Sequence, residues 1–196
     1  LFRSLTADER PLNPDGVSVD LMDAVGRTET IITHASGNRR GRLVPCWESL
    51  IPRGYIGWGE STQLGYGLGL AMGAKLGAPE NLVINVMGDG AFGMAGMDIE
   101  PAAREEIPFL TILLNTSALG GYEQYLPVAV ERYGTKCLTG DYAKVADGLG
   151  AYSERVEAPD EIVPAIERAQ EAIAGGRPAL LEMITKEEYD FSKFWR

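Results

Sequence analysis

The stretch that decides the fold is residues 81–121, which read NLVINVMGDGAFGMAGMDIEPAAREEIPFLTILLNTSALGG. Two continuous apolar runs, residues 82–87 and 109–114, flank a segment typical of a helix, and polar residues or glycines follow each run. This pattern predicts two parallel strands joined by a crossover helix. Because ligands bind at the carboxyl ends of strands in open α/β sheets, we expect Asp89 and residues 115–118 to face one crevice.

Charge separates two interpretations of this unit. The spacing of Gly88, Gly90 and Gly93 fits the dinucleotide fingerprint of a Rossmann-type nucleotide-binding enzyme. However, an acid, Asp89, lies inside the turn, and the next strand ends in the neutral Asn115, where that fold uses an acid for the ribose. A carboxylate about 4 Å from a phosphate oxygen is repelled by about 4 kcal/mol at an effective dielectric constant near 20. A cation must lie between them, so we expect Asp89 to bind a metal such as Mg²⁺ through oxygen ligands.

The Gly-Asp-Gly sequence at residues 88–90, followed about two dozen residues later by Asn115, resembles the thiamine-diphosphate motif of the acetolactate synthase and pyruvate decarboxylase group. Pro108 before the second strand and residues 65–68 before the first belong to the same resemblance. It covers nearly the whole chain as the C-terminal diphosphate-binding (PP) domain of this 2-oxo acid decarboxylase-like family. The implied fold is α/β, a doubly wound, mostly parallel sheet with helices on both faces.

The resemblance also implies thiamine diphosphate and Mg²⁺ as cofactors, and it assigns their binding residues. The implied metal ligands are Asp89, Asn115, Thr116 and the carbonyl of Ala118, with Thr116 standing where the family usually has a second asparagine. Leu64 corresponds to the apolar wedge that bends the cofactor so that the pyrimidine amine meets C2 of the thiazolium, and it alone is assigned a catalytic role. The candidate cofactor-binding residues are Leu64, Asp89, Asn115 and Thr116 together with Gly37, Asn38, Arg39, Thr62, Gln63, Gly88, Gly90, Ala91, Leu119 and Gly120.

The resemblance implies that this chain forms half of an active site. In the family, a glutamate from a separate pyrimidine-binding (PYR) domain activates the cofactor, and no residue here matches it. We therefore expect a lyase or transferase that decarboxylates a 2-oxo acid or joins its product to a second carbonyl. It would act only with a PYR domain, in the same polypeptide or in a partner chain of a homo- or hetero-oligomer. A Rossmann-type enzyme and a non-catalytic PP-like subunit are the alternatives.

Composition excludes other classes of function. The 196 residues carry a net charge of -10, and the 18 lysines and arginines form no basic stripe, which argues against nucleic acid as a partner. No segment reaches the ~20 apolar residues of a membrane span, and the first residues do not resemble a signal peptide. We therefore expect a cytoplasmic protein without a membrane partner.

Turn signals and apolar periodicity divide the chain into a linker or arm at residues 1–16, a cofactor-binding domain at residues 17–185 and a tail at residues 186–196. We expect about five strands. The predicted strands are residues 30–33, 82–87, 109–114, 152–156 and 178–184, and the predicted helices are residues 17–25, 65–75, 91–107, 141–149 and 162–174. Residues 46–60 are predicted to form an irregular aromatic loop, and residues 120–132 a loop with a short helix.

Overall fold

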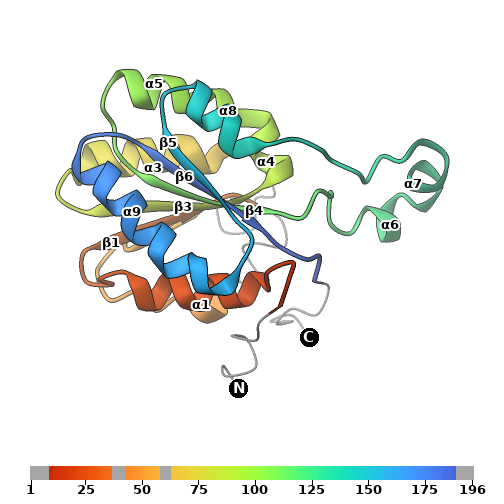
Figure 1. The fold of residues 1–196 in the computed structure, drawn as a ribbon, viewed down its shortest axis with the longest axis horizontal. Helices are drawn as coiled ribbons and strands as arrows, with labels where there is room; N and C mark the ends of the chain where they lie inside the picture. Colours follow the sequence, from red (N-terminus) through yellow and green to blue (C-terminus); the bar gives the residue numbers. More distant parts are fainter. Residues whose placement is uncertain (1–8, 37–42, 58–62, 189–196) are drawn as a thin grey trace.

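The structure is a computed structural model that describes residues 9–36, 43–57 and 63–188, and its centre is a parallel sheet between two layers of helices (Figure 1). The strands are β1 (Thr30–His34), β2 (Tyr55–Ile56), β3 (Leu82–Gly88), β4 (Leu110–Asn115), β5 (Tyr152–Val156) and β6 (Ala179–Ile184). Their order in the sheet is β2-β1-β3-β4-β6-β5, and every neighbouring pair is parallel. The predicted α/β fold is confirmed.

Helices cover both faces of this sheet (Figure 1). One face carries α1 (Pro14–Ala24) and α9 (Ile162–Ala174), the latter preceded by the 3-10 turn η3 (Pro159–Glu161). The other face carries α3 (Tyr66–Gly77), α4 (Asp89–Ala95), the 3-10 turn η2 (Gly96–Asp98), α5 (Ile99–Arg104) and α8 (Tyr142–Gly148). Two short helices, α6 (Tyr122–Tyr125) and α7 (Pro127–Tyr133), project away from the layered body (Figure 1).

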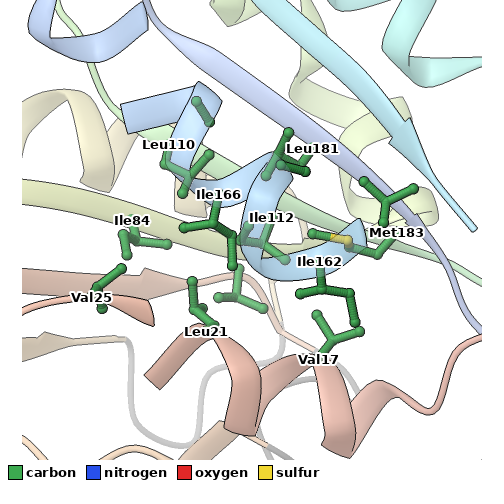
Figure 2. Packing of buried hydrophobic residues seen from close by; sticks show 14 of the residues in the cluster. Val17, Leu21, Val25, Ile84, Leu110, Ile112, Ile162, Ile166, Leu181 and Met183 are labelled. Atoms are coloured by element: carbon green, nitrogen blue, oxygen red, sulfur yellow. The ribbon is translucent and has the colours of Figure 1, made fainter. Parts of the chain in front are cut away.

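The central strands are mostly apolar because both of their faces are buried, and the exceptions within them include the buried Asn85 and Thr111. Ile84 of β3 and Ile112 of β4 pack beneath α1 and α9, where they meet side chains such as Leu21 and Ile166 (Figure 2). The alternate residues of the same strands belong to the second core, beneath α3, α4, α5 and α8. An alternating apolar and polar pattern would have placed one face of the sheet in water.

The helix predicted at residues 91–107 is wrong as a single element, because the chain forms α4, η2 and α5 instead. A Cβ atom at Gly96 would lie only 2.6 Å from the ring of Phe92, so the backbone turns tightly against this side chain. Pro101 has no peptide N–H to continue an α-helical ladder from α4. α4 is therefore a short helix separate from α5, and its first turn follows directly after the end of β3.

The amino-terminal helix begins earlier than expected. α1 starts at Pro14 rather than residue 17, because the side chain of Asn13 accepts a 2.9 Å hydrogen bond from the peptide N–H of Asp15. Leu12 is 1% exposed and forms a parallel bridge with Thr185 at the end of β6. Residues 12–16 therefore pack as part of the layered body, and the division of the chain at residue 16 stays a prediction.

Two other loop predictions also need correction. The stretch at residues 46–60, expected to be irregular, contains β2, which pairs with β1 through Ile32 and Tyr55. The segment at residues 120–132 forms two short helices rather than one. In the part of the chain that the structure describes, no helix has the length and apolar character needed to cross a bilayer.

Candidate functional site

The register of the sheet brings the ends of β3 and β4 together. Gly88 pairs with Leu114, so the residues that follow them, Asp89 and Asn115, are neighbours at the carboxyl edge. Both side chains are buried, with exposures of 3% and 4%. The two strand ends that the sequence of residues 81–121 predicted to face one another are thus neighbours in the sheet.

Asp89 is surrounded by peptide N–H groups. Its Oδ1 atom accepts a hydrogen bond from Gly90 at 2.9 Å, and its Oδ2 atom accepts from Thr116 at 3.1 Å and from Ala118 at 3.3 Å. A buried carboxylate is tolerated only when such donors replace its water. These contacts fix the turn after β4 against the first turn of α4.

The turn that contacts this carboxylate also carries two oxygen donors. The hydroxyl of Thr116 donates to the carbonyl of Ala118 at 3.3 Å, and both residues contact Asp89 through their peptide N–H groups. Neighbouring oxygen ligands of Mg²⁺ lie about 3.0 Å apart when each metal–oxygen bond is about 2.1 Å. One carboxylate, one hydroxyl and one carbonyl are hard oxygen donors of the kind that Mg²⁺ prefers.

A site built only from protein carboxylates and imidazoles is a different arrangement. Within residues 9–36, 43–57 and 63–188, no group of three or more His, Cys, Asp or Glu side chains is placed to hold a metal.

Asn115 uses its amide within the protein. The Nδ2 atom donates to Oε1 of Glu182 at 2.7 Å, and the Oδ1 atom accepts from the peptide N–H of Ser117 at 2.8 Å and from its hydroxyl at 3.3 Å. Ser117 has a φ of 54°, in the left-handed region. The Asn115 side chain thus stabilises the turn that carries Thr116 and Ala118.

Glu182 is a site residue that the sequence analysis missed. It lies in β6 with 0% exposure, and besides Asn115 it accepts a 3.0 Å hydrogen bond from the peptide N–H of Ala143 in the first turn of α8. Arg155 on β5 lies 4.0 Å from its carboxylate. The sequence did contain one signal, a single acid within the otherwise apolar sequence PALLEMI at residues 178–184. An acidic side chain is buried almost only when it is paired.

Tyr142 lies close to the same groups. Its ring meets Phe92 edge-on, with the ring centroids 5.6 Å apart. Burial raises the pKa of the Tyr142 hydroxyl, and the negative charges of Asp89 and Glu182 raise it further. Tyr142 therefore stays protonated near neutral pH and can donate a hydrogen bond at this edge of the crevice.

The segment before α3 packs against the first turns of α4. Gly65 has a φ of 86°, and a Cβ atom there would lie 3.1 Å from Ala95 and 3.4 Å from the carbonyl of Ala91. Leu64 is partly buried on the core that contains Ala91, whereas Gln63 is exposed. Leu64 therefore packs against the same hydrophobic core as the first turn of α4, which begins at Asp89.

The remaining predicted residues fall into two groups. Leu119 reaches over Gly90, since a Cβ atom at Gly90 would lie 2.7 Å from its methyl group, and Gly120 is exposed next to it. Gly37, Asn38, Arg39 and Thr62 lie outside the described residues.

His34, at the end of β1, packs in the protein interior. It is 2% exposed, and its ring lies against Tyr55 at a centroid distance of 5.2 Å. A Cβ atom at Gly57 would come within 2.1 Å of its Nε2 atom. These contacts give His34 a local packing role at the end of β1.

Fold and site together define an α/β domain that presents a buried acid, hard oxygen ligands and the start of a helix at the carboxyl edge of a parallel sheet. Residues 37–183 match the family described as "Thiamine pyrophosphate enzyme, C-terminal TPP binding domain". The chain belongs to this family.

Comparison with individual proteins gives the same grouping. The chain is 32% identical over 191 residues to a probable acetolactate synthase of Mycobacterium bovis, covering 92% of this chain and 33% of that protein. It is 27% identical over 185 residues to a probable acetolactate synthase large subunit of Methanocaldococcus jannaschii, covering 90% of this chain and 31% of that protein. The chain thus spans about a third of the length of these curated relatives.

A solved structure shows the same fold. The chain superposes on a thiamine diphosphate-dependent 4-hydroxybenzoylformate decarboxylase from Rhodococcus jostii with a TM-score of 0.79 at 24% sequence identity. The match covers 91% of this chain and 33% of that one. At this identity the likeness concerns the fold alone.

Proposed function

We propose that this chain is the Mg²⁺- and thiamine-diphosphate-binding half of a 2-oxo acid decarboxylase or carboligase of the acetolactate synthase type. The observation that carries the proposal is Asp89, buried at the end of β3 and hydrogen-bonded to the turn that bears the Thr116 hydroxyl and the Ala118 carbonyl. Membership in a thiamine-pyrophosphate-binding family and similarity to acetolactate synthases support the choice of cofactor and reaction class.

In this proposal, Asp89, the Thr116 hydroxyl and the Ala118 carbonyl hold Mg²⁺. Asn115 was also a predicted ligand, but its amide already bonds Glu182 and Ser117, so we favour Thr116 for the ligand role. Ala91, in the first turn of α4, has a peptide N–H group without an acceptor in the helical ladder, whereas the Gly90 N–H already donates to Asp89. In this position the Ala91 N–H can face the diphosphate, and the closely approaching Gly90 backbone can border it, while the metal neutralises its charge.

The chain's own residues then bind, orient and exclude water. Leu64 is proposed to support the cofactor from the α4 side, which requires a bulky uncharged side chain in a fixed place. When bound, thiamine diphosphate supplies the electron sink that permits a 2-oxo acid to lose carbon dioxide. Gln63, Leu119 and Gly120 complete the proposed cofactor-binding surface together with residues 37–39 and 62.

We further propose that the active site needs a PYR domain, on the same or another polypeptide. Exposed apolar side chains on the elements that follow β3 and β4 support a partner surface: Met94 and Met97 on α4 and η2 are 66% and 68% exposed, and Tyr125, Val128 and Tyr133 on α6 and α7 are 79%, 58% and 76% exposed. Large apolar side chains gathered on a surface mark interaction sites. The proposed partner supplies the glutamate that activates the cofactor.

Turnover of 2-oxo acids tests this assignment. Consumption of pyruvate with Mg²⁺ and thiamine diphosphate is measured for the chain alone and for the chain combined with a PYR domain. We expect activity only in the combination. Robust turnover by the chain alone would contradict the half-site, and tight binding of NADH without Mg²⁺ would favour the nucleotide-binding alternative.

A further inference from the structure

Glu182 is a fully buried carboxylate whose position in the fold connects three elements. It lies in β6, opposite Leu113 of β4 and Arg155 of β5 in the register of the sheet. Its two oxygen atoms receive different donors: Nδ2 of Asn115 at 2.7 Å on Oε1, and the peptide N–H of Ala143 at 3.0 Å on Oε2. A buried charge of this kind costs several kcal/mol unless its hydrogen bonds are made, so its presence calls for a physical reason.

The bond to Asn115 continues to the candidate metal site. Since Nδ2 of Asn115 points at Glu182, its Oδ1 atom must point at Ser117, where it accepts the peptide N–H at 2.8 Å. That bond holds Ser117 in its left-handed conformation. Thr116 and Ala118, on either side of Ser117, then point their N–H groups at Asp89.

We propose that Glu182 is a positioning residue that fixes the orientation of the Asn115 amide and thereby sets the metal affinity of the turn at residues 115–118. This inference rests on the proposed function, and it deepens that function by assigning a role to a residue outside the ligand set. Glu182 touches neither the proposed metal ligands nor the crevice through any bond described above, so it acts through Asn115.

A carboxylate is needed here because both partners are donors. Glutamine has a single acceptor oxygen, and the Ala143 N–H cannot rotate because it belongs to the first turn of α8. We expect glutamine to turn its oxygen toward Ala143 and its NH₂ group toward Asn115. The Asn115 amide must then rotate, which places its own NH₂ group against the Ser117 N–H and breaks the turn-stabilising bond.

The same reasoning predicts a rescue. In the double variant Glu182→Gln/Asn115→Asp, the glutamine NH₂ group meets a carboxylate oxygen, and the second carboxylate oxygen accepts the Ser117 N–H. Every donor again has an acceptor, and the total charge equals that of the native pair. The single variant Asn115→Asp instead brings two carboxylates into the contact now made at 2.7 Å.

The first experiment uses metal-free chain and NMR hydrogen exchange at the Ser117 peptide N–H. We expect exchange at least about tenfold faster in Glu182→Gln, corresponding to about 1.4 kcal/mol, and a return to within about threefold of native exchange in the double variant. Equal exchange in native chain and Glu182→Gln, or no rescue in the double variant, would overturn the role in orienting Asn115. Because no ligand is present, this result does not depend on the proposed function.

The second experiment measures Mn²⁺ binding by electron paramagnetic resonance in the presence of thiamine diphosphate. We expect about tenfold weaker binding in Glu182→Gln and recovery in the double variant. Leu180→Val serves as the control, since it loosens β6 in the second core without touching Asn115, and it should keep native affinity. If Leu180→Val weakens binding as much as Glu182→Gln does, Glu182 acts only through general stability and the inference fails. If the native chain binds no Mn²⁺, the proposed function fails, while the exchange experiment still decides the orientation of Asn115.

Discussion

Replacing Asp89 by asparagine separates the structural and metal-binding roles of its carboxylate. The native side chain accepts three peptide N–H groups, from Gly90, Thr116 and Ala118. If the asparagine oxygen serves the turn after β4, the NH₂ group faces the Gly90 N–H and one buried donor loses its acceptor. That loss costs about 1–3 kcal/mol. For a chain of this size, about 2 kcal/mol lowers the melting temperature by about 4–8 °C.

The change in melting temperature on adding Mg²⁺ and thiamine diphosphate tests the metal-binding role of Asp89. Native chain with Mg²⁺ and thiamine diphosphate at about 100 times the dissociation constant gains about 2.7 kcal/mol, or about 5–11 °C in melting temperature. We expect Asp89→Asn to lose almost all of this gain, because the cation that separates carboxylate and diphosphate has lost its charged ligand. The assay is thermal unfolding followed by circular dichroism, with and without both ligands.

Asp98→Asn is the matched control, since it removes the same charge from an exposed acid in η2, close along the chain. It should unfold like native chain and keep the full ligand response. An Asp89→Asn variant that still gains about 5 °C or more from the two ligands would refute the argument that Asp89 holds the metal.

Three further predictions concern affinity and stability. Thr116→Val removes the hydroxyl that lies beside the Ala118 carbonyl, so titration calorimetry should show Mg²⁺ affinity about tenfold lower with little change in melting temperature; unchanged affinity would exclude the hydroxyl as a ligand. Burial and the neighbouring Asp23 raise the pKa of Asp20, so the folded chain binds this proton more tightly than the unfolded chain does. Ionisation of Asp20 therefore lowers the free energy of unfolding as the pH rises above 3.8. Asp20→Asn should therefore stabilise the chain at pH 7 and do so less at pH 3, and urea unfolding that shows an equal gain at both values would contradict this. Gly96→Ala places a methyl group against Phe92, and we expect about 1–3 kcal/mol lower stability in urea unfolding; native stability would show that the ring moves aside without cost.

The strands next to the site were predictable from sequence because local pattern and tertiary environment agree there. Residues 82–87 and 109–114 are continuous apolar runs, and β3 and β4 are buried on both faces. Asp89 and the residues after β4 could be placed together because parallel strands end at the same edge. β2 was not predicted, because its two residues, Tyr55 and Ile56, are too few to show the periodic pattern that identifies a strand.

The hydrogen bonds that organise the site could not be predicted from the sequence, because they join residues that lie far apart along the chain. Glu182 bonds Asn115 and Ala143, which lie 67 and 39 residues away in the sequence. A pattern among neighbouring residues does not show such distant pairs, and the apolar sequence around Glu182 predicted only a strand. The break between α4 and α5 likewise depends on how tightly Gly96 meets Phe92, which the helical pattern of residues 91–107 does not reveal.

The central claim is that Asp89 accepts a diphosphate cofactor only through a shared divalent cation. The most direct test is titration calorimetry of thiamine diphosphate into the native chain, once with Mg²⁺ and once with excess chelator. The account predicts saturable binding with Mg²⁺ and at least about a hundredfold weaker binding in chelator. Equal binding in both solutions would contradict it.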